Sequence, residues 1–256
     1  LKFHAGDIRK RDHVKLEQAD RDHHAFHIMD AYAWSLAPTG FRAWLKRLLS
    51  AKEREAQEEG RRALAILRLL GLFDRPATAD CLGVLWKAPA IPRLTEPLAG
   101  LHEEQRNCVL TELEAARLLT VNREEGTGRL VSLDAHPHIR EYFAVQVRSP
   151  GFSRSGPQKP PKGGTTSDAW RAAHRRLYEN LCATTKEGDQ PTLEDLQPLY
   201  QAVAHGCQAG LQQEAYQDVY FTRIKRGNDY YSVHKLGAFA SDLGAIACFF
   251  DEPWKR

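Results

Sequence analysis

The sequence has no long apolar run and no excess of one charge. Its 256 residues include 36 basic and 33 acidic side chains, a net charge of +3, which gives no global electrostatic case for nucleic acid or a membrane surface. The longest apolar stretch, residues 63–72, is interrupted by Arg68 and is too short to span a bilayer. The start of the chain, Leu1–His4, lacks the apolar region of a signal peptide. We therefore expect a cytoplasmic protein with no membrane partner.

Cysteine is scarce and follows no pattern. The number is odd and no C-x-x-C pair occurs, so neither a disulfide framework nor a zinc site is indicated. Each cysteine sits among apolar neighbours at a helical position, which favours buried free thiols in a reducing compartment. The five are Cys81, Cys108, Cys182, Cys207 and Cys248.

The motifs of self-sufficient catalysis are also missing. No G-x-x-x-x-G-K-[ST] phosphate loop, no H-E-x-x-H pair and no supported Ser/His/Asp or Cys/His set occurs. His23 and His27 are spaced i and i+4, but no acidic or cysteine partner is near, so we expect a polar helix face there. We expect no catalytic residue, no metal site and no enzyme within this chain.

The length suits two or three small domains. Residues 1–60 form a helical lead-in, with one helix carried by Phe26, Met29 and Leu36. The chain begins with Leu1 and not with methionine, which leaves open that it is part of a longer polypeptide. Residues 149–167 are rich in proline, glycine, serine and lysine, a composition typical of a flexible linker.

Residues 61–148 have the element order of a winged helix. Ala63, Ile66, Leu67 and Leu70 fall on one helical face, and Thr78 is placed to cap a second helix. A third helix is predicted over 102–118. Residues 118–121 and 129–133 favour strands and enclose a turn with two glycines, which indicates a hairpin. Pro137 fits the first turn of a final helix.

Residues 168–256 alternate apolar stripes at helical spacing. We predict helices from Asp168, around 196–203, over 214–224 and over 233–250. Small residues on the last helix would allow close helix–helix approach. The class is therefore mainly α: a winged-helix domain with a small β-hairpin, flanked by helical segments. The C-terminal part begins an α-solenoid similar to tetratricopeptide repeats, although no clean 34-residue period is visible.

Several stretches together resemble one family. The sequence Ala-His-Pro-His-Ile-Arg-Glu-Tyr-Phe at 135–143, the helix at 67–76 and the segment 205–254 are similar to STAND nucleotide switches. These are signal-transducing ATPases with NACHT or NB-ARC modules, and the similar part is their winged helix and the helical region before the repeats. The resemblance implies that the missing phosphate loop lies in an NTPase core upstream of Leu1.

The resemblance also implies a site residue. In the family, a histidine at the start of the last winged-helix helix contacts the β-phosphate of ADP, and His136 matches that position. The family triplet commonly reads Met-His-Asp, whereas here it is Ala135-His136-Pro137, so only the histidine carries over. The implied cofactor of a full-length protein is ADP or ATP, and none is expected in this chain alone. The implied partners are the upstream NTPase domain and a ligand or protein on the helical arm.

Activation would lead to oligomerisation, and in a bacterial member the purpose would be defence or stress signalling.

Three alternatives stay open. His136 could simply cap its own helix. The winged helix could belong to a DNA-binding regulator, although Glu103, Glu104, Glu112 and Glu114 on its third helix argue against phosphate contacts. The helical arm could be a scaffold that binds a protein through residues 214–250.

Overall fold

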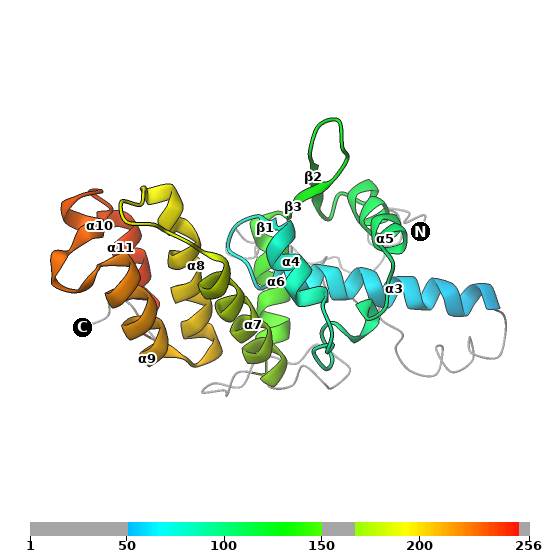
Figure 1. Cartoon of the computed structure of the whole chain (residues 1–256). Helices are drawn as coiled ribbons and strands as arrows, with labels where there is room; N and C mark the ends of the chain where they lie inside the picture. The colour runs from blue at the N-terminus through cyan, green and yellow to red at the C-terminus, as the bar shows by residue number, and fades with distance from the viewer. Residues whose placement is uncertain (1–50, 150–166, 251–256) are drawn as a thin grey trace, which may run out of the picture. The chain divides into compact units, whose positions relative to one another are not determined.

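Figure 1 shows a computed structural model, in which residues 51–149 and 167–250 are described, with side chains from residue 58 onward. The predictions for residues 1–50, including His23 and His27, and for 150–166 lie outside these ranges. Within them the chain is mainly α-helical with one three-stranded antiparallel sheet, which confirms the prediction of a mainly α protein. No helix in the described ranges is both long and apolar enough to cross a membrane.

The described residues divide into two compact units, which are treated separately. The first holds residues up to Ala79 and from Pro92 to 149, and the second holds Asp80–Ile91 and the residues from 167. The elements of the first stretch of chain are α3 (Ala51–Leu70), β1 (Ala77–Thr78), α4 (Ala79–Trp86), the 3₁₀ turn η2 (Glu96–Leu98), α5 (Glu103–Ala115), β2 (Thr120–Arg123), β3 (Leu130–Asp134) and α6 (Pro137–Arg148).

Helix α3 is the central element of the first unit. Its described part runs from Ala51 to Leu70, so it includes residues before the predicted start at residue 61. From Ala63 to Phe73 every side chain is buried except that of Arg68, and a helix buried on all sides lies inside a core. It contacts α5, α6 and η2. Arg68 donates from Nε to the Gln146 side chain of α6 at 2.7 Å, and burial lowers its pKa to about 10.

Gly71 lets the chain after α3 approach the backbone of α6. A Cβ on residue 71 would lie 2.5 Å from the amide nitrogen of Ala144 and 2.7 Å from the carbonyl carbon of Phe143. Both contacts are far inside van der Waals distance, and both are to backbone, which has no rotamer with which to yield. The absence of a side chain at this position therefore sets the spacing between the end of α3 and the middle of α6.

The sheet consists of the hairpin strands β2 and β3 together with β1, and α6 follows β3 in the chain. Strand order is β1-β3-β2, and both pairings are antiparallel. The fully buried Leu133 of β3 stands opposite Ala77 of β1 and Val121 of β2. The predicted hairpin and the third helix are confirmed. Strand β1 was not predicted. It ends at Thr78, the residue directly before α4 at which a helix cap was expected.

The second unit contains a series of helices that lie side by side (Figure 1). Helices α7 and α8 pack antiparallel: Trp170, near the start of α7, donates a hydrogen bond to Gln208, near the end of α8. The predicted helix over 214–224 is wound mainly as a π-helix. The predicted helix over 233–250 is broken at Gly237, where φ is +62°. The elements are α7 (Asp168–Thr184), α8 (Leu193–Ala209), α9 (Gln212–Glu214), the π-helix η3 (Ala215–Ile224), the 3₁₀ turn η4 (Gly227–Asp229), α10 (Tyr231–His234) and α11 (Phe239–Ala247).

The Gly71 contact predicts a selective loss of stability. Gly71→Ala should lower the free energy of unfolding by about 1–3 kcal/mol, because the added methyl must push two backbone segments apart. Gly83→Ala in α4 is the matched control, since a Cβ there meets nothing within 4 Å and alanine favours the helix by up to about 1 kcal/mol. Urea unfolding of both variants measures the difference. Equal effects of the two substitutions would contradict the close approach.

Candidate functional site

The N-terminus of α6 is built by two adjacent residues. Pro137 occupies the first helical position, where its missing N–H costs nothing. His136 is the N-cap, and its Nδ1 accepts a hydrogen bond from the backbone N–H of His138 at 3.3 Å. The backbone carbonyl of His136 accepts from the amides of Ile139 and Arg140. The structure therefore places His136 in the capping role that the sequence left open.

Capping leaves the other ring nitrogen of His136 available. Since Nδ1 is the acceptor, the neutral imidazole carries its proton on Nε2. The residue is exposed, and its ring stands 5.1 Å from the ring of His138, centroid to centroid. The first turn of α6 contains no acidic residue, so its own sequence does not neutralise the partial positive charge of the helix start. The arrangement can donate a hydrogen bond to an anion.

An ion pair fixes this helix start to the sheet. Arg140 Nη1 donates to Asp134 Oδ1 at 3.0 Å, and the same oxygen accepts from the Ala135 amide at 2.8 Å. Asp134 ends β3 and Arg140 lies in the first turn of α6, so the turn between them is held from both sides. The Arg140 side chain is 14% exposed and that of Asp134 is 40% exposed, so the pair is shielded from water on the arginine side only. His136 is therefore presented from a braced turn.

The exposed face of α5 is acidic. Glu103, Glu104, Glu112 and Glu114 are all exposed, and Glu114 also accepts a bond from the Val121 amide of β2 at 2.9 Å. A helix that enters a DNA groove has to neutralise phosphates. This face would repel them, which disfavours the alternative of a DNA-binding regulator.

A buried carboxylate in the second unit was missed by the sequence analysis. Asp242 of α11 is 5% exposed and accepts three hydroxyl hydrogen bonds. The donors are Tyr200 of α8 at 2.5 Å, Ser232 of α10 at 2.9 Å and Tyr220 of η3 at 3.3 Å. A buried charge needs such partners. The signal in the sequence was a single acidic residue inside the otherwise uncharged run 236–250.

The carboxylate network draws four helical elements together. Burial raises the pKa values of Tyr200 and Tyr220, and the hydrogen bonds to Asp242 add to the rise. Both phenols therefore stay protonated in the folded chain and remain donors. We assign this cluster a structural role, because all three hydroxyls are used to satisfy the carboxylate.

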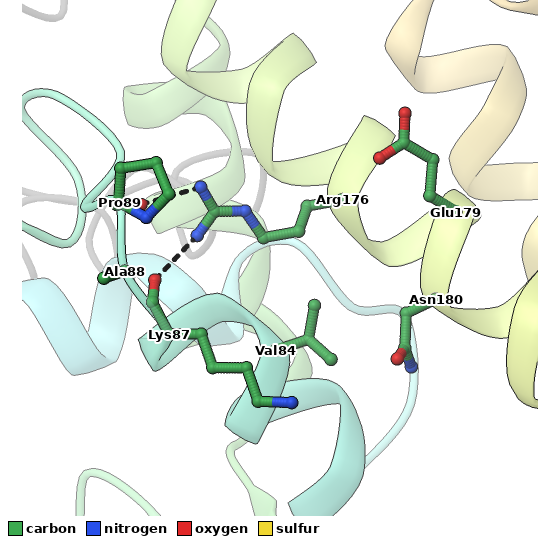
Figure 2. Close-up of a pocket in the computed structure, with 7 residues that line it drawn as sticks. All are labelled: Val84, Lys87, Ala88, Pro89, Arg176, Glu179 and Asn180. Carbon is green, nitrogen blue, oxygen red and sulfur yellow. Dashed lines mark hydrogen bonds between the residues drawn. The ribbon is translucent and has the colours of Figure 1, made fainter.

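An open hollow of about 320 Å³ lies beside α7 (Figure 2). Arg176 borders it, but its guanidinium donates to the backbone carbonyls of Lys87 at 3.0 Å and Pro89 at 2.8 Å. Lys87 and Glu179 place opposite charges on the same rim. The Arg176 guanidinium is already used in these bonds, and the rim carries charges of both signs. The hollow therefore shows no chemical preference for one class of ligand.

All five cysteines are free thiols, as predicted, but they are not all buried. Cys81 and Cys207 are buried, Cys182 and Cys248 are half-buried, and Cys108 is exposed on α5. The prediction of burial was wrong for Cys108, because α5 buries only Val109, Leu110 and Leu113 and leaves Cys108 on its exposed side. Burial raises the pKa of Cys207 to about 12. Within the described residues, no group of three or more metal-ligating side chains is assembled.

The raised pKa values of the tyrosines bonded to Asp242 predict that the folded chain loses stability at alkaline pH. The folded chain keeps Tyr200 protonated, whereas unfolded tyrosine ionises near pH ~10. The unfolded state then binds fewer protons, so stability is full below that pH and is lost as pH rises above it. Tyr200→Phe removes this ionisable group. Above the pKa of unfolded tyrosine, the free energy of unfolding should then fall less steeply with pH, by about 1.4 kcal/mol per pH unit. Urea unfolding at several alkaline pH values measures the slopes, and identical slopes would contradict the assignment.

The capping role of His136 gives a second prediction. His136→Ala removes the side-chain acceptor and should lower the free energy of unfolding by up to about 1 kcal/mol. His136→Asp keeps an acceptor and adds a favourable charge at a helix start, so it should be at least as stable as the native chain. Thermal unfolding of the pair provides the comparison. An Ala variant as stable as the Asp variant would argue against the cap.

We compared the chain with protein-family models, with curated proteins and with solved structures, and none of the three comparisons returned a match. A function for this chain therefore rests on the resemblance in its sequence and on the geometry at the start of α6.

Proposed function

We propose that this chain is the regulatory part of a STAND nucleotide switch. Residues 61–148 act as a winged helix that packs on an upstream nucleotide-binding core when ADP is bound. ATP and a ligand release it, and the helical arm that follows senses the ligand or protein. The chain itself catalyses nothing. Its task is to convert the nucleotide state into a change of position, and oligomerisation follows from that change.

The order of elements supports the winged-helix assignment. Helices α3, α4 and α5 precede the hairpin of β2 and β3, and α6 follows it. This is the order of helix, helix, helix, β-ribbon and helix that the sequence indicated. The antiparallel packing of α7 and α8, followed by η3 against α8, supports a helical arm of the kind that precedes repeats.

The observation that carries the proposal is the geometry of His136. Its ring is exposed at a helix start, Nδ1 is held by the cap, and Nε2–H is free to donate. A helix N-terminus favours an anion through its dipole. The first amides of α6 are already bonded to His136, so the imidazole Nε2–H is the group that would donate to a phosphate. One histidine cannot hold a nucleotide, so the core has to supply the remaining contacts. The hydrogen bond from His136 to the β-phosphate of ADP would exist in the closed state and be lost in the open state, which is the differential contact a switch requires.

Nucleotide retention tests the proposal. A longer polypeptide that places the nucleotide-binding core before this chain should purify with ADP. His136→Ala and His136→Asp should both weaken ADP retention by about tenfold or more, since a charge-assisted hydrogen bond contributes about 1.5–3 kcal/mol. His136→Asp keeps the cap, so its loss of ADP cannot be attributed to a frayed α6. The measurement is the nucleotide content after purification and the ADP dissociation rate.

The two parts of the proposal fail in different ways. ADP retained equally by the native protein and both variants would show that His136 is not the sensor, even within a switch protein. A longer polypeptide that binds no nucleotide at all would remove the switch itself.

A further inference from the structure

Two buried histidines meet where α7 packs against α8. His174 of α7 is 2% exposed and His205 of α8 is 7% exposed. Their Nδ1 atoms lie 2.9 Å apart, which is hydrogen-bond distance, and their ring centroids are 5.0 Å apart. Imidazole is the side chain whose charge changes nearest to neutral pH. A buried contact between two helices therefore contains two groups that acid can charge.

The surroundings of the pair are apolar. The Trp170 ring lies against His174, with centroids 4.3 Å apart, and its Nε1 donates to Gln208 of α8 at 3.2 Å, which holds the indole in place. Along the two helices, the neighbouring Ala173, Leu177 and Ala202 are fully buried. Such a setting has little water to stabilise a charge, so it favours neutral rings.

The short contact limits the number of protons that the pair can bind. A hydrogen bond between two Nδ1 atoms needs one donor and one acceptor, so one of the two atoms carries no hydrogen. An imidazolium carries hydrogen on both nitrogens, and the acceptor ring is therefore neutral. The folded pair can hold one positive charge at most, whichever ring carries it. In an opened or unfolded chain both rings are able to become charged.

The other titratable groups near the pair are neutral, paired or screened. Burial raises the pKa values of Tyr178 and Cys207, so both stay protonated. Exposed charges act weakly across water, and Asp242 is bonded to hydroxyl groups. The proton count of the pair itself therefore decides its response to acid. The titratable and charged groups on the adjoining turns and on the elements packed against α8 are Arg171, which is paired with Asp168, Arg175 and Tyr178 of α7, Cys207 of α8, Glu214 of α9, Asp218 of η3 and Asp242 of α11.

We infer that the contact between His174 and His205 makes the packing of α7 against α8 sensitive to pH, so that mild acid opens it. The two rings hold the helices together while at least one of them is neutral. Charging the second ring removes the shared hydrogen bond and places two like charges in an apolar contact. The inference needs no nucleotide and concerns the second unit only, so it stands apart from the proposed role of His136.

The direction of the pH effect follows from the number of protons bound. Unfolded histidine takes up a proton near pH ~6.5. Above that pH the closed and open forms bind equal numbers of protons, and the contact contributes its full stability. As the pH falls below it, the open form binds two further protons and the closed pair binds one at most. The ratio of open to closed chains should therefore rise about tenfold or more for each pH unit.

Hydrogen exchange of the full chain tests the inference. Exchange is measured by mass spectrometry from about pH 8 to about pH 5 and corrected for the intrinsic pH dependence of amide exchange. Protection of the amides in α7 and α8 should fall about tenfold or more per pH unit below about pH 6. Helix α3 of the first unit contains no histidine and serves as the internal reference, because its protection should not follow this dependence.

Two variants identify the group that responds. His205→Gln keeps a hydrogen-bond acceptor for His174 and removes one ionisable ring, so the closed and open forms can again bind the same number of protons. The fall in protection of α7 and α8 should then become about tenfold smaller per pH unit. His234→Gln is the matched control, since His234 is an exposed histidine in α10 of the same unit, and it should behave like the native chain.

A measurement on the native chain does not depend on any variant folding. In ¹⁵N NMR spectra of the folded chain at about pH 6, one Nδ1 of the pair should keep the resonance of an unprotonated nitrogen. Two fully protonated rings in the folded chain would overturn the inference. Protection of α7 and α8 that stays constant down to about pH 5 would also overturn it, as would an unchanged dependence in a folded His205→Gln chain.

Discussion

The first unit depends on the absence of a side chain at residue 71. From Ala63 onward, α3 is buried on nearly every side, and its end lies against the backbone of α6 at a distance that only glycine permits. This contact sets the position of α6. The ion pair between Asp134 and Arg140 then fixes the start of α6 to strand β3. The position of His136 is thus a consequence of packing behind it, and a site presented this way needs little rearrangement to meet a ligand.

The second unit is organised around polar groups as much as apolar ones. The buried Asp242 receives hydroxyl bonds from three other elements, and the Nδ1 atoms of His174 and His205 approach to 2.9 Å between α7 and α8. Buried polar contacts of this kind contribute direction as well as stability, because an unsatisfied partner is costly. The bonds to Asp242 explain how the short elements α10 and α11 keep defined positions.

The fold could be predicted where apolar spacing was clear. The second half of α3, the third helix, the hairpin and the start of α6 all followed from periodicity, proline and glycine. Strand β1 did not, because two residues cannot display a period. The π-winding of η3 was also beyond prediction, since its apolar spacing over ten residues does not separate π from α. The break at Gly237 could have been suspected, because glycine readily adopts positive φ.

The candidate site was predicted only in part. His136 was named through a family resemblance and a proline that marks a helix start, and its place at the N-cap of α6 agrees with that reasoning. Which nitrogen caps the helix and which faces solvent is a matter of side-chain geometry, and no sequence pattern carries it. The Asp242 cluster depends on residues up to 42 positions apart, so it could not be assembled without the fold.

The most direct test of the proposed sensor is the tautomer of the His136 ring, observed by ¹⁵N NMR on the chain. We predict that Nδ1 is the unprotonated acceptor and that Nε2 is the protonated donor. In the longer polypeptide, ADP should shift the Nε2 resonance and leave Nδ1 little changed. A ring protonated on Nδ1, or an Nε2 resonance that does not respond to ADP, would contradict the proposal that His136 is a nucleotide sensor.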